Sequence, residues 1–269
     1  MTDFLQTIVR RKEADIARAR RTVAEDELVA RARARTDFRP FEARLGRPGD
    51  SGVNIIAEIK RASPSKGDIR PDLDAAETAT RYEAGGAAAV SVLTDTAFFK
   101  GSLDDLTATR AACSLPILRK EFIISRYQVY EAAAAGADAI LLIARILTPD
   151  KLRQLYDLCR ELDMGALVEI HTPDDARVVA ACGARLVGIN NRNLSTFETD
   201  LGVAQALVAE LNPAQVPVAA SGIAGAGDIR ANLDVGIFNF LVGESIVRAA
   251  DPAAFIRGLM AVDGRQGAA

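Results

Sequence analysis

Glu58 and Lys60 end an apolar run in the segment Asn-Ile-Ile-Ala-Glu-Ile-Lys-Arg-Ala-Ser-Pro-Ser-Lys-Gly, which spans residues 54–67. Side chains two apart on a strand point the same way, so this carboxylate and this ammonium group leave the strand on one side. A pair of this kind can take part in acid–base chemistry or bind an anion. The alternative is a strand that has reached the surface and carries a solvated salt bridge. The segment alone leaves both interpretations open.

Polar residues also follow several of the other apolar runs in the chain. The ends of these runs are Arg119-Lys120-Glu121-Phe122, Glu169, Asn190 with Arg192, Ser221-Gly222 and Gly243-Glu244-Ser245. One charged strand end would mean little. Several such ends together predict acid–base catalysis, because carboxylates, lysines and an amide–guanidinium pair then converge on one rim.

The last two of these ends predict an anion site. Ser221-Gly222 and Gly243-Glu244-Ser245 open short loops before helical segments, where backbone N–H groups and a helix N-terminus can hold a phosphate. Either loop alone is equally compatible with a simple turn. Together, at the end of the chain, they favour phosphate, because phosphate sites of (β/α)₈ barrels commonly follow the last two strands.

The elements that must position these residues are short, nearly continuous apolar runs separated by amphipathic stretches. The runs are 54–59, 88–93, 116–119, 139–143, 166–170, 186–190, 216–220 and 238–242. Such runs are typical of strands buried on both faces, and their spacing of roughly 20 to 35 residues suits βα units. We therefore predict an α/β fold, a (β/α)₈ TIM barrel. An open doubly wound sheet would usually carry a GxGxxG fingerprint after its first strand, and none is there.

Residues 1–50 precede the first strand and predict a helical extension of a single domain that spans 1–269. Leu5, Ile8, Val9 and Ile16 recur at helical spacing, so this helix should pack on the barrel. Arginines are dense between Arg10 and Arg47, but acidic residues are interleaved. A solvated helical face is therefore favoured over a nucleic-acid-binding arm.

Composition excludes several classes of protein. The net charge is −3 and aromatic residues make up 5%, which argues against nucleic-acid partners. No stretch predicts a membrane span or a signal peptide. The three cysteines have no metal spacing, and a cytoplasmic location is expected. The only histidine, His171, is expected to precede a helix capped by Thr172 or Asp174 and not to be catalytic.

At this point the sequence resembles the indole-3-glycerol phosphate synthase family of tryptophan biosynthesis. The matching stretches are IIAEIKRASPSKG (55–67), LPILRKEFII (115–124), GADAILLIARIL (136–147), LVEIH (167–171), LVGINNRNLSTFETDL (186–201) and LVGESIVR (241–248). The resemblance implies ring closure of 1-(o-carboxyphenylamino)-1-deoxyribulose 5-phosphate, with loss of CO₂ and water. It implies no metal and no organic cofactor. We expect a monomer, with at most weak association with other enzymes of the pathway.

The resemblance also assigns roles to residues. Lys120 would be the acid that polarises the ketone, Glu169 the base, and Glu58 a carboxylate beside the reacting atoms. Lys60 would hold carboxylate or phosphate and is a further proton donor. Asn190 and Arg192 would position the ribulose hydroxyls and the carboxylate. The anthranilate ring would be held by Phe99, Phe122 and Leu141. The phosphate would be bound by Ser221, Gly222, Gly243 and Glu244, the last two through their backbone.

One position departs from the family. The run 216–220 usually ends in Glu-Ser-Gly, whereas this chain has Ala220-Ser221-Gly222. Either Glu58 and Glu169 suffice, or the enzyme is slower, or the chain is a specialised relative. Two alternatives stay open: another phosphosugar barrel such as phosphoribosylanthranilate isomerase, and a non-catalytic phosphate-ligand-binding relative.

Overall fold

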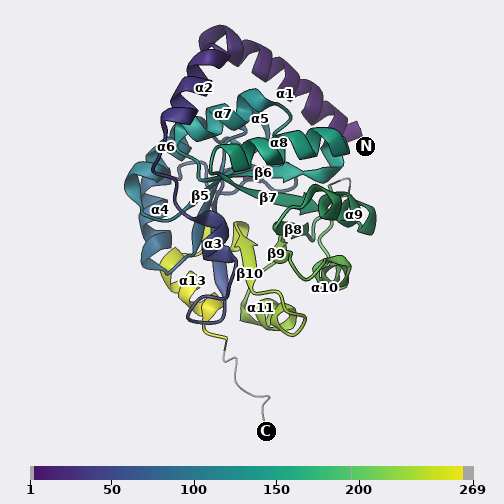
Figure 1. The fold of residues 1–269 in the computed structure, drawn as a ribbon. Coiled ribbons are helices and arrows are strands. Elements are labelled where there is room, and N and C mark those ends of the chain that lie inside the picture. Colours follow the sequence, from purple (N-terminus) through teal and green to yellow (C-terminus); the bar gives the residue numbers. More distant parts are fainter. Residues whose placement is uncertain (1–2, 195, 263–269) are drawn as a thin grey trace.

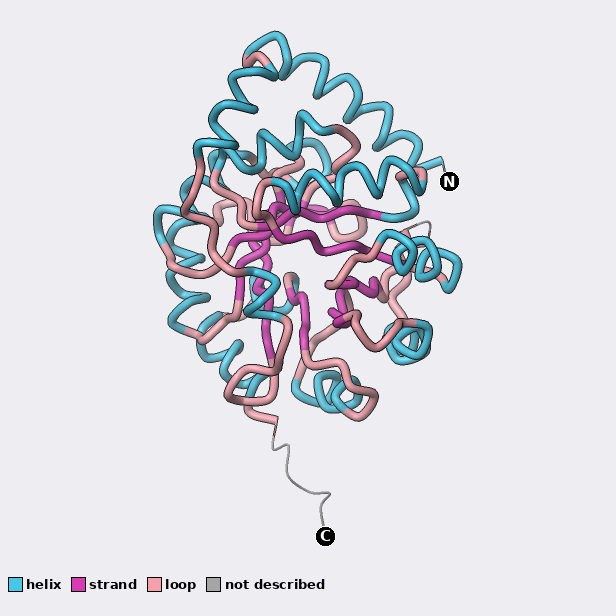
Figure 2. The backbone as a smooth tube through the Cα atoms, viewed as in Figure 1, coloured by secondary structure: helices cyan, strands magenta, loops and turns pink. Residues whose placement is uncertain are grey.

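A closed barrel of parallel strands forms the centre of the molecule. The computed structural model describes residues 3–194 and 196–262. Within these residues the strands pair in the order β1-β10-β9-β8-β7-β6-β5-β4, and Figure 2 shows them enclosed by helices. The strands are β1 (Asn54–Ile59), β4 (Ala89–Leu93), β5 (Ile117–Lys120), β6 (Ala139–Ile143), β7 (Gly165–Ile170), β8 (Leu186–Asn190), β9 (Val216–Ala220) and β10 (Asn239–Val242). The predicted (β/α)₈ barrel is confirmed.

Helices connect the strands and cover the outside of the barrel. They are α4 (Ala75–Ala84), α5 (Thr96–Phe99), α6 (Leu103–Ala112), α7 (Arg126–Ala135), α8 (Pro149–Glu161), α9 (Pro173–Cys182), α10 (Gly202–Leu207), α11 (Ala226–Leu233), α12 (Glu244–Arg248) and α13 (Pro252–Met260), with 3₁₀ turns η1 (Ala144–Ile146) and η2 (Val208–Glu210). Local sequence sets their ends. Ser125 caps α7 through its side chain, and Gly136 and Gly183 end α7 and α9 in the left-handed conformation that glycine tolerates.

The alternation of side chains along each strand decides which residues face the barrel interior. Ile56, Leu118, Leu167 and Val218 belong to the interior cluster, whereas their chain neighbours pack outward against helices. Glu58, Lys120, Glu169 and Ala220 lie two residues further along the same strands, so they share the inward direction. The charged residues thus reach the interior because of their position in the sequence.

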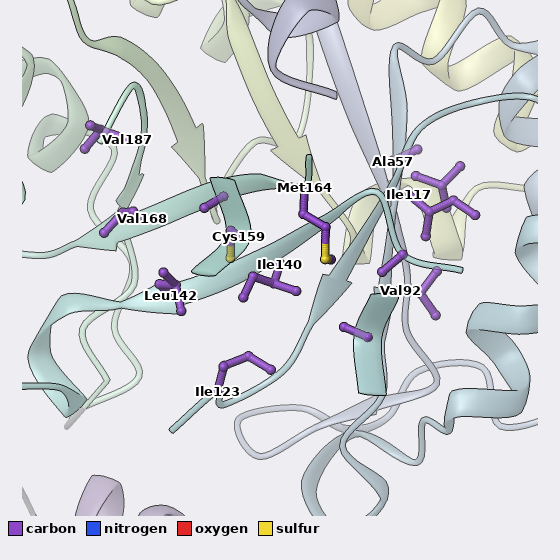
Figure 3. Close-up of a cluster of buried hydrophobic side chains, with 14 of the residues drawn as sticks. Ala57, Val92, Ile117, Ile123, Ile140, Leu142, Cys159, Met164, Val168 and Val187 are labelled. Carbon is purple, nitrogen blue, oxygen red and sulfur yellow. The ribbon is translucent and has the colours of Figure 1, made fainter. Parts of the chain in front are cut away.

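The larger apolar core lies between the strands and the surrounding helices. Figure 3 shows part of it, with Ile140 of β6 beside Cys159 and Met164. Such side chains are almost completely buried, and burial of one large aliphatic side chain stabilises the fold by about 1.5–3 kcal/mol. This layer holds the strand ends, and therefore the site, in fixed relative positions.

The N-terminal extension consists of α1 (Asp3–Thr22), α2 (Glu25–Ala34) and α3 (Phe41–Leu45). In Figure 1, α1 and α2 form the purple hairpin at one edge of the molecule, and α2 packs on α7. Leu5 and Ile8 are fully or almost fully buried in the interior cluster, and the buried Lys12 forms ion pairs with Asp95 at 2.6 Å and Glu121 at 3.1 Å. The expected packing of this helix on the barrel is therefore observed.

Part of the arginine-rich segment is anchored instead of solvated. The Arg35 guanidinium lies 2.7 Å from the buried carboxylate of Asp138, which also accepts from Arg110 at 2.9 Å. Arg39 donates to the carbonyl of Leu115 at 2.7 Å. These bonds hold the segment between α2 and α3 against α6 and α7. The interleaved charges in the sequence predicted solvated arginines and did not indicate this anchoring.

Within the described part of the chain, none of the helices has the length and apolar character needed to cross a membrane. The expected domain limits include residues 1–2 and 263–269, which lie outside the described residues. The organisation as a single domain with an N-terminal extension stays a prediction.

Candidate active site

A cavity of about 680 Å³ opens at the carboxyl ends of the strands, a volume typical of small-molecule sites. Every residue that the sequence assigned to the site lines it. These residues are Glu58, Lys60, Phe99, Lys120, Phe122, Leu141, Glu169, Asn190, Arg192, Ser221, Gly222, Gly243 and Glu244. The structure therefore brings together residues that are far apart in the sequence, whereas their roles stay predictions.

Glu58 links the two lysines of the cavity. Its carboxylate lies 2.7 Å from Lys60 Nζ through Oε1 and 3.3 Å from Lys120 Nζ through Oε2. Burial opposes ionisation of Glu58, but the two ammonium groups outweigh it, so its pKa is well below the ordinary value. Burial also opposes the charge of Lys120, whereas Glu58 and Glu169 favour it, and the pKa of Lys120 is raised. At neutral pH the site therefore presents a carboxylate clamped between two ammonium groups.

This clamp predicts a pH effect in the variant Glu58→Gln. Glu58 is the strongest of the groups that favour the charged form of Lys120, so its loss lowers the pKa of Lys120. If protonated Lys120 is required, the alkaline limb of the kcat/KM profile, which reports the free enzyme, should move to lower pH. The exposed Glu77, which pairs with Arg81 on α4, provides the control Glu77→Gln. An alkaline limb that stays in place in Glu58→Gln would contradict the coupling.

Asn190 holds Glu169 and is itself held by the backbone of Arg192. Asn190 donates from Nδ2 to Glu169 Oε1 at 3.1 Å, and the Asn190 Oδ1 accepts from the backbone N–H of Arg192 at 3.0 Å. The second bond fixes which way the amide points. Arg192 itself donates to Ser65 Oγ at 3.1 Å and to the Phe197 carbonyl at 3.0 Å. Its guanidinium is thus positioned at the mouth of the cavity, where a bidentate fork suits a carboxylate.

The two glycine loops lie side by side. Ser245 Oγ donates to the Ile223 carbonyl at 2.8 Å, which joins the loop after β10 to the loop after β9. Ser221 and Gly222 both have positive φ, 70° and 84°, and such a kinked backbone can present successive N–H groups to an anion. A Cβ placed on Gly243 would lie 3.0 Å from Lys60 Nζ. The Lys60 ammonium therefore lies beside the second loop.

Apolar side chains form a further part of the cavity lining, the apolar wall. Phe99 and Phe122 lie with ring centroids 6.2 Å apart, and Leu141 also lines the cavity. Leu5 and Ile8 of α1 complete the wall. The sequence predicted that α1 packs on the barrel, but its helical periodicity gave no signal that these two residues would reach the site.

The structure also separates residues that are neighbours in the sequence. Arg119 precedes Lys120 but points outward, where it forms a 2.8 Å ion pair with Glu131 of α7. Ala220 is 3% exposed within the interior cluster and does not line the cavity. Strand alternation could have identified Arg119 as an outward residue.

The loop after β1 contains a small antiparallel hairpin of β2 (Ala62–Ser63) and β3 (Gly67–Asp68). Its tip, which includes Ser65 and Lys66, lines the cavity. Lys66 has no role in the reaction as the resemblance describes it, but its position in the lining adds a third lysine to the cavity. Thr172 caps α9 with Asp175 in a capping box, as the first of the two predicted caps.

Comparison with known proteins places these features in a family. The family model described as "Indole-3-glycerol phosphate synthase" matches residues 5–259. Proteins named indole-3-glycerol phosphate synthase from Desulfosudis oleivorans and Syntrophobacter fumaroxidans are 56% and 48% identical to the chain, over 97% and 96% of it and 99% and 98% of their own lengths.

Among solved structures, a 3-hexulose-6-phosphate synthase has a TM-score of 0.61 at 19% identity, covering 78% of this chain and 99% of its own. A thiamine phosphate pyrophosphorylase from Pyrococcus furiosus has a TM-score of 0.59 at 14% identity, covering 78% and 95%. At such identities these likenesses concern the barrel fold alone.

Proposed function

The chain belongs to the indole-3-glycerol phosphate synthase family, and we propose that its barrel cavity converts 1-(o-carboxyphenylamino)-1-deoxyribulose 5-phosphate to indole-3-glycerol phosphate. The reaction is a carboxy-lyase reaction of tryptophan biosynthesis, which releases CO₂ and water. The observation that carries this proposal is the Lys60–Glu58–Lys120 clamp, which lines the same cavity as Glu169, the apolar wall and the two glycine loops.

In the first step the ring carbon that bears the carboxylate attacks the ketone carbon of the ribulose chain. Negative charge develops on the ketone oxygen, and the Lys120 ammonium stabilises and protonates it. The carboxylate then leaves as CO₂, and the electron pair of the broken bond returns to the ring. Phe99, Phe122 and Leu141 hold the anthranilate ring flat against the apolar wall, so that this carbon lies near the ketone.

In the second step a hydroxyl group leaves from the former ketone carbon and the aniline nitrogen loses its proton. Glu169 lines the cavity and takes that proton, and a protonated lysine assists departure of the hydroxyl. A proton then moves from the adjacent methylene carbon to the nitrogen, which completes the indole ring with its N–H. Glu58 is a poor candidate for the base, because its two oxygens already face Lys60 and Lys120. Its role is to hold both lysines in place and to favour the charged form of Lys120, which leaves Glu169 as the base even though position 220 is alanine.

The phosphate binds where the two loops meet. Ser221, Gly222, Gly243 and Glu244 supply backbone N–H groups, and the Lys60 ammonium beside Gly243 supplies the charge. Because the Lys60 ammonium lies so close to this loop, phosphate is favoured as the main ligand of Lys60. Glu244 contributes through its backbone, since its side chain already pairs with Arg248 at 3.1 Å.

Two other functions account less well for the residues of this cavity. A phosphoribosylanthranilate isomerase would need a phosphosugar site, but it gives no role to the clamp of two lysines around one carboxylate. A non-catalytic phosphate-ligand sensor would need the loops alone, and Lys120, Glu169, Asn190 and Arg192 would then be without a purpose. Indole formation distinguishes both from the proposed activity.

We further propose that the protein works in the cytoplasm as a monomer on this small phosphorylated substrate, with at most weak association with other enzymes of the pathway. Its three cysteines, Cys113, Cys159 and Cys182, are buried and unpaired, which suits a reducing compartment.

Turnover should not require a metal ion. Among the described residues, no His, Cys, Asp and Glu side chains are grouped so that they could hold a metal. We expect the indole absorbance to rise at the same rate before and after dialysis against excess EDTA, with the carboxyphenylamino substrate as the only addition. Loss of turnover after dialysis that one divalent ion restores would contradict the proposed acid–base mechanism.

A further inference from the structure

The only histidine of the chain lies directly behind the proposed base. His171 follows β7 and is two residues from Glu169, so both side chains leave the strand on the same side. His171 Nε2 lies 3.5 Å from Glu169 Oε1, and each of the two side chains is only 5% exposed. His171 does not line the cavity, whereas Glu169 does. The imidazole therefore contacts the carboxylate without itself lining the cavity.

The imidazole has no other partner to explain its burial. Within the part of the chain that the structure describes, neither Nδ1 nor Nε2 of His171 forms a hydrogen bond. A buried polar group without a partner is unfavourable. The backbone of His171 is fixed, because its N–H donates to Asp175 Oδ2 at 2.9 Å in the cap of α9. A movement of roughly 0.5 Å would bring Nε2 within hydrogen-bond distance of Glu169.

Both neighbouring nitrogen groups point at the same oxygen of Glu169. Asn190 Nδ2 donates to Oε1 at 3.1 Å, and Oε1 is also the oxygen nearest His171 Nε2. Oε2 accepts no hydrogen bond from any residue described in the structure. An arrangement with two donors on Oε1 would fix the carboxylate plane and leave Oε2 to take the proton.

We propose that His171 is a positioning residue, which in its neutral form donates from Nε2 to Oε1 of Glu169 and so holds Oε2 toward the substrate. The proposal rests on the proposed function, in which Glu169 is the base. The charged groups around the imidazole are Glu169, Arg145 of η1, Asp175 of α9 and Lys120 of β5.

The surroundings favour the neutral form of the imidazole. Burial lowers the pKa of His171, and Arg145 and Lys120 act in the same direction, whereas Glu169 and Asp175 oppose them. A neutral imidazole carries one N–H group, which the nearby carboxylate directs to Nε2. Such a donor orients the carboxylate without fixing it in an ion pair.

The test compares His171→Leu, which removes the donor, with His171→Gln, which keeps an amide N–H at a similar distance from the backbone. For His171→Leu we expect kcat to fall at least roughly tenfold with little change in KM. His171→Gln should return kcat most of the way, and thermal unfolding should show that all variants are folded.

Repeating His171→Leu in a Glu169→Gln background separates positioning from a structural role. We expect no further loss of kcat there, because the imidazole acts only through the carboxylate. An equal loss in both backgrounds, an unchanged kcat in His171→Leu, or a His171→Gln variant as slow as His171→Leu would each overturn the inference while the proposed function stands. If Glu169→Gln alone keeps the parent kcat, the proposed base is wrong, and the inference fails with it.

Discussion

Replacing Lys120 by alanine or Glu169 by glutamine should each lower kcat by roughly 10²- to 10⁴-fold, the usual contribution of a general acid or base. Lys120→Ala removes the only ammonium group assigned to the ketone oxygen, and Lys60 is held 2.7 Å from the other oxygen of Glu58 beside the phosphate loop. Glu169→Gln keeps the shape of the side chain and an acceptor for Asn190, but it cannot take a proton.

The measurement is kcat by indole absorbance, with thermal unfolding as a check on the fold. Matched controls are Lys151→Ala on α8 and Glu27→Gln on α2, neither of which lines the cavity. Both controls should keep the parent kcat. A near-parent kcat in Lys120→Ala or in Glu169→Gln would remove the role assigned to that residue.

The second large effect is expected from one added methyl group at Gly243. A Cβ there would lie 2.4 Å from Glu58 Oε1 and 3.0 Å from Lys60 Nζ. The carboxylate cannot stay in place, and the clamp that holds both lysines must shift. Since a misplacement of about 1 Å can cost roughly 10²-fold in rate, Gly243→Ala should lower kcat/KM by about that factor, with a raised KM because the phosphate loop is displaced as well.

Gly258→Ala is the matched control, because a Cβ at Gly258 of α13 meets no atom within 4 Å. That variant should keep its kinetics and unfold at an equal or slightly higher temperature, since alanine favours a helix interior over glycine. Parent-like kcat/KM in Gly243→Ala would show that the clamp tolerates displacement and is not required.

Glu244→Ala should leave KM nearly unchanged if only the backbone of Glu244 binds phosphate.

The strands were predictable because their signal is local. Each apolar run lies within one residue of an observed strand, since a strand buried on both faces needs a continuous apolar sequence. The direction of the site residues follows from the same strands by alternation: Glu58 shares the direction of Ile56, and Glu169 that of Leu167.

The missed features depend on tertiary contacts, for which the sequence carries no local signal. The periodicity of α1 marks Leu5 and Ile8 as apolar, but only the path of the extension brings them into the cavity wall. The buried ion pairs of Lys12 with Asp95 and Glu121 join residues that are about a hundred positions apart in the chain. His171 was set aside as a residue before a helix cap, and its approach to Glu169 is visible only in three dimensions.

The most direct test of the central claim uses substrate that is isotopically labelled in its carboxyl group, incubated with the protein while indole absorbance and released CO₂ are followed together. The proposed chemistry predicts that labelled CO₂ appears in the same amount and at the same rate as indole. In Lys120→Ala the two rates should fall together by the same factor. A product that retains the label, or a protein that binds the substrate and forms no indole, would contradict the assignment of this cavity to decarboxylating ring closure.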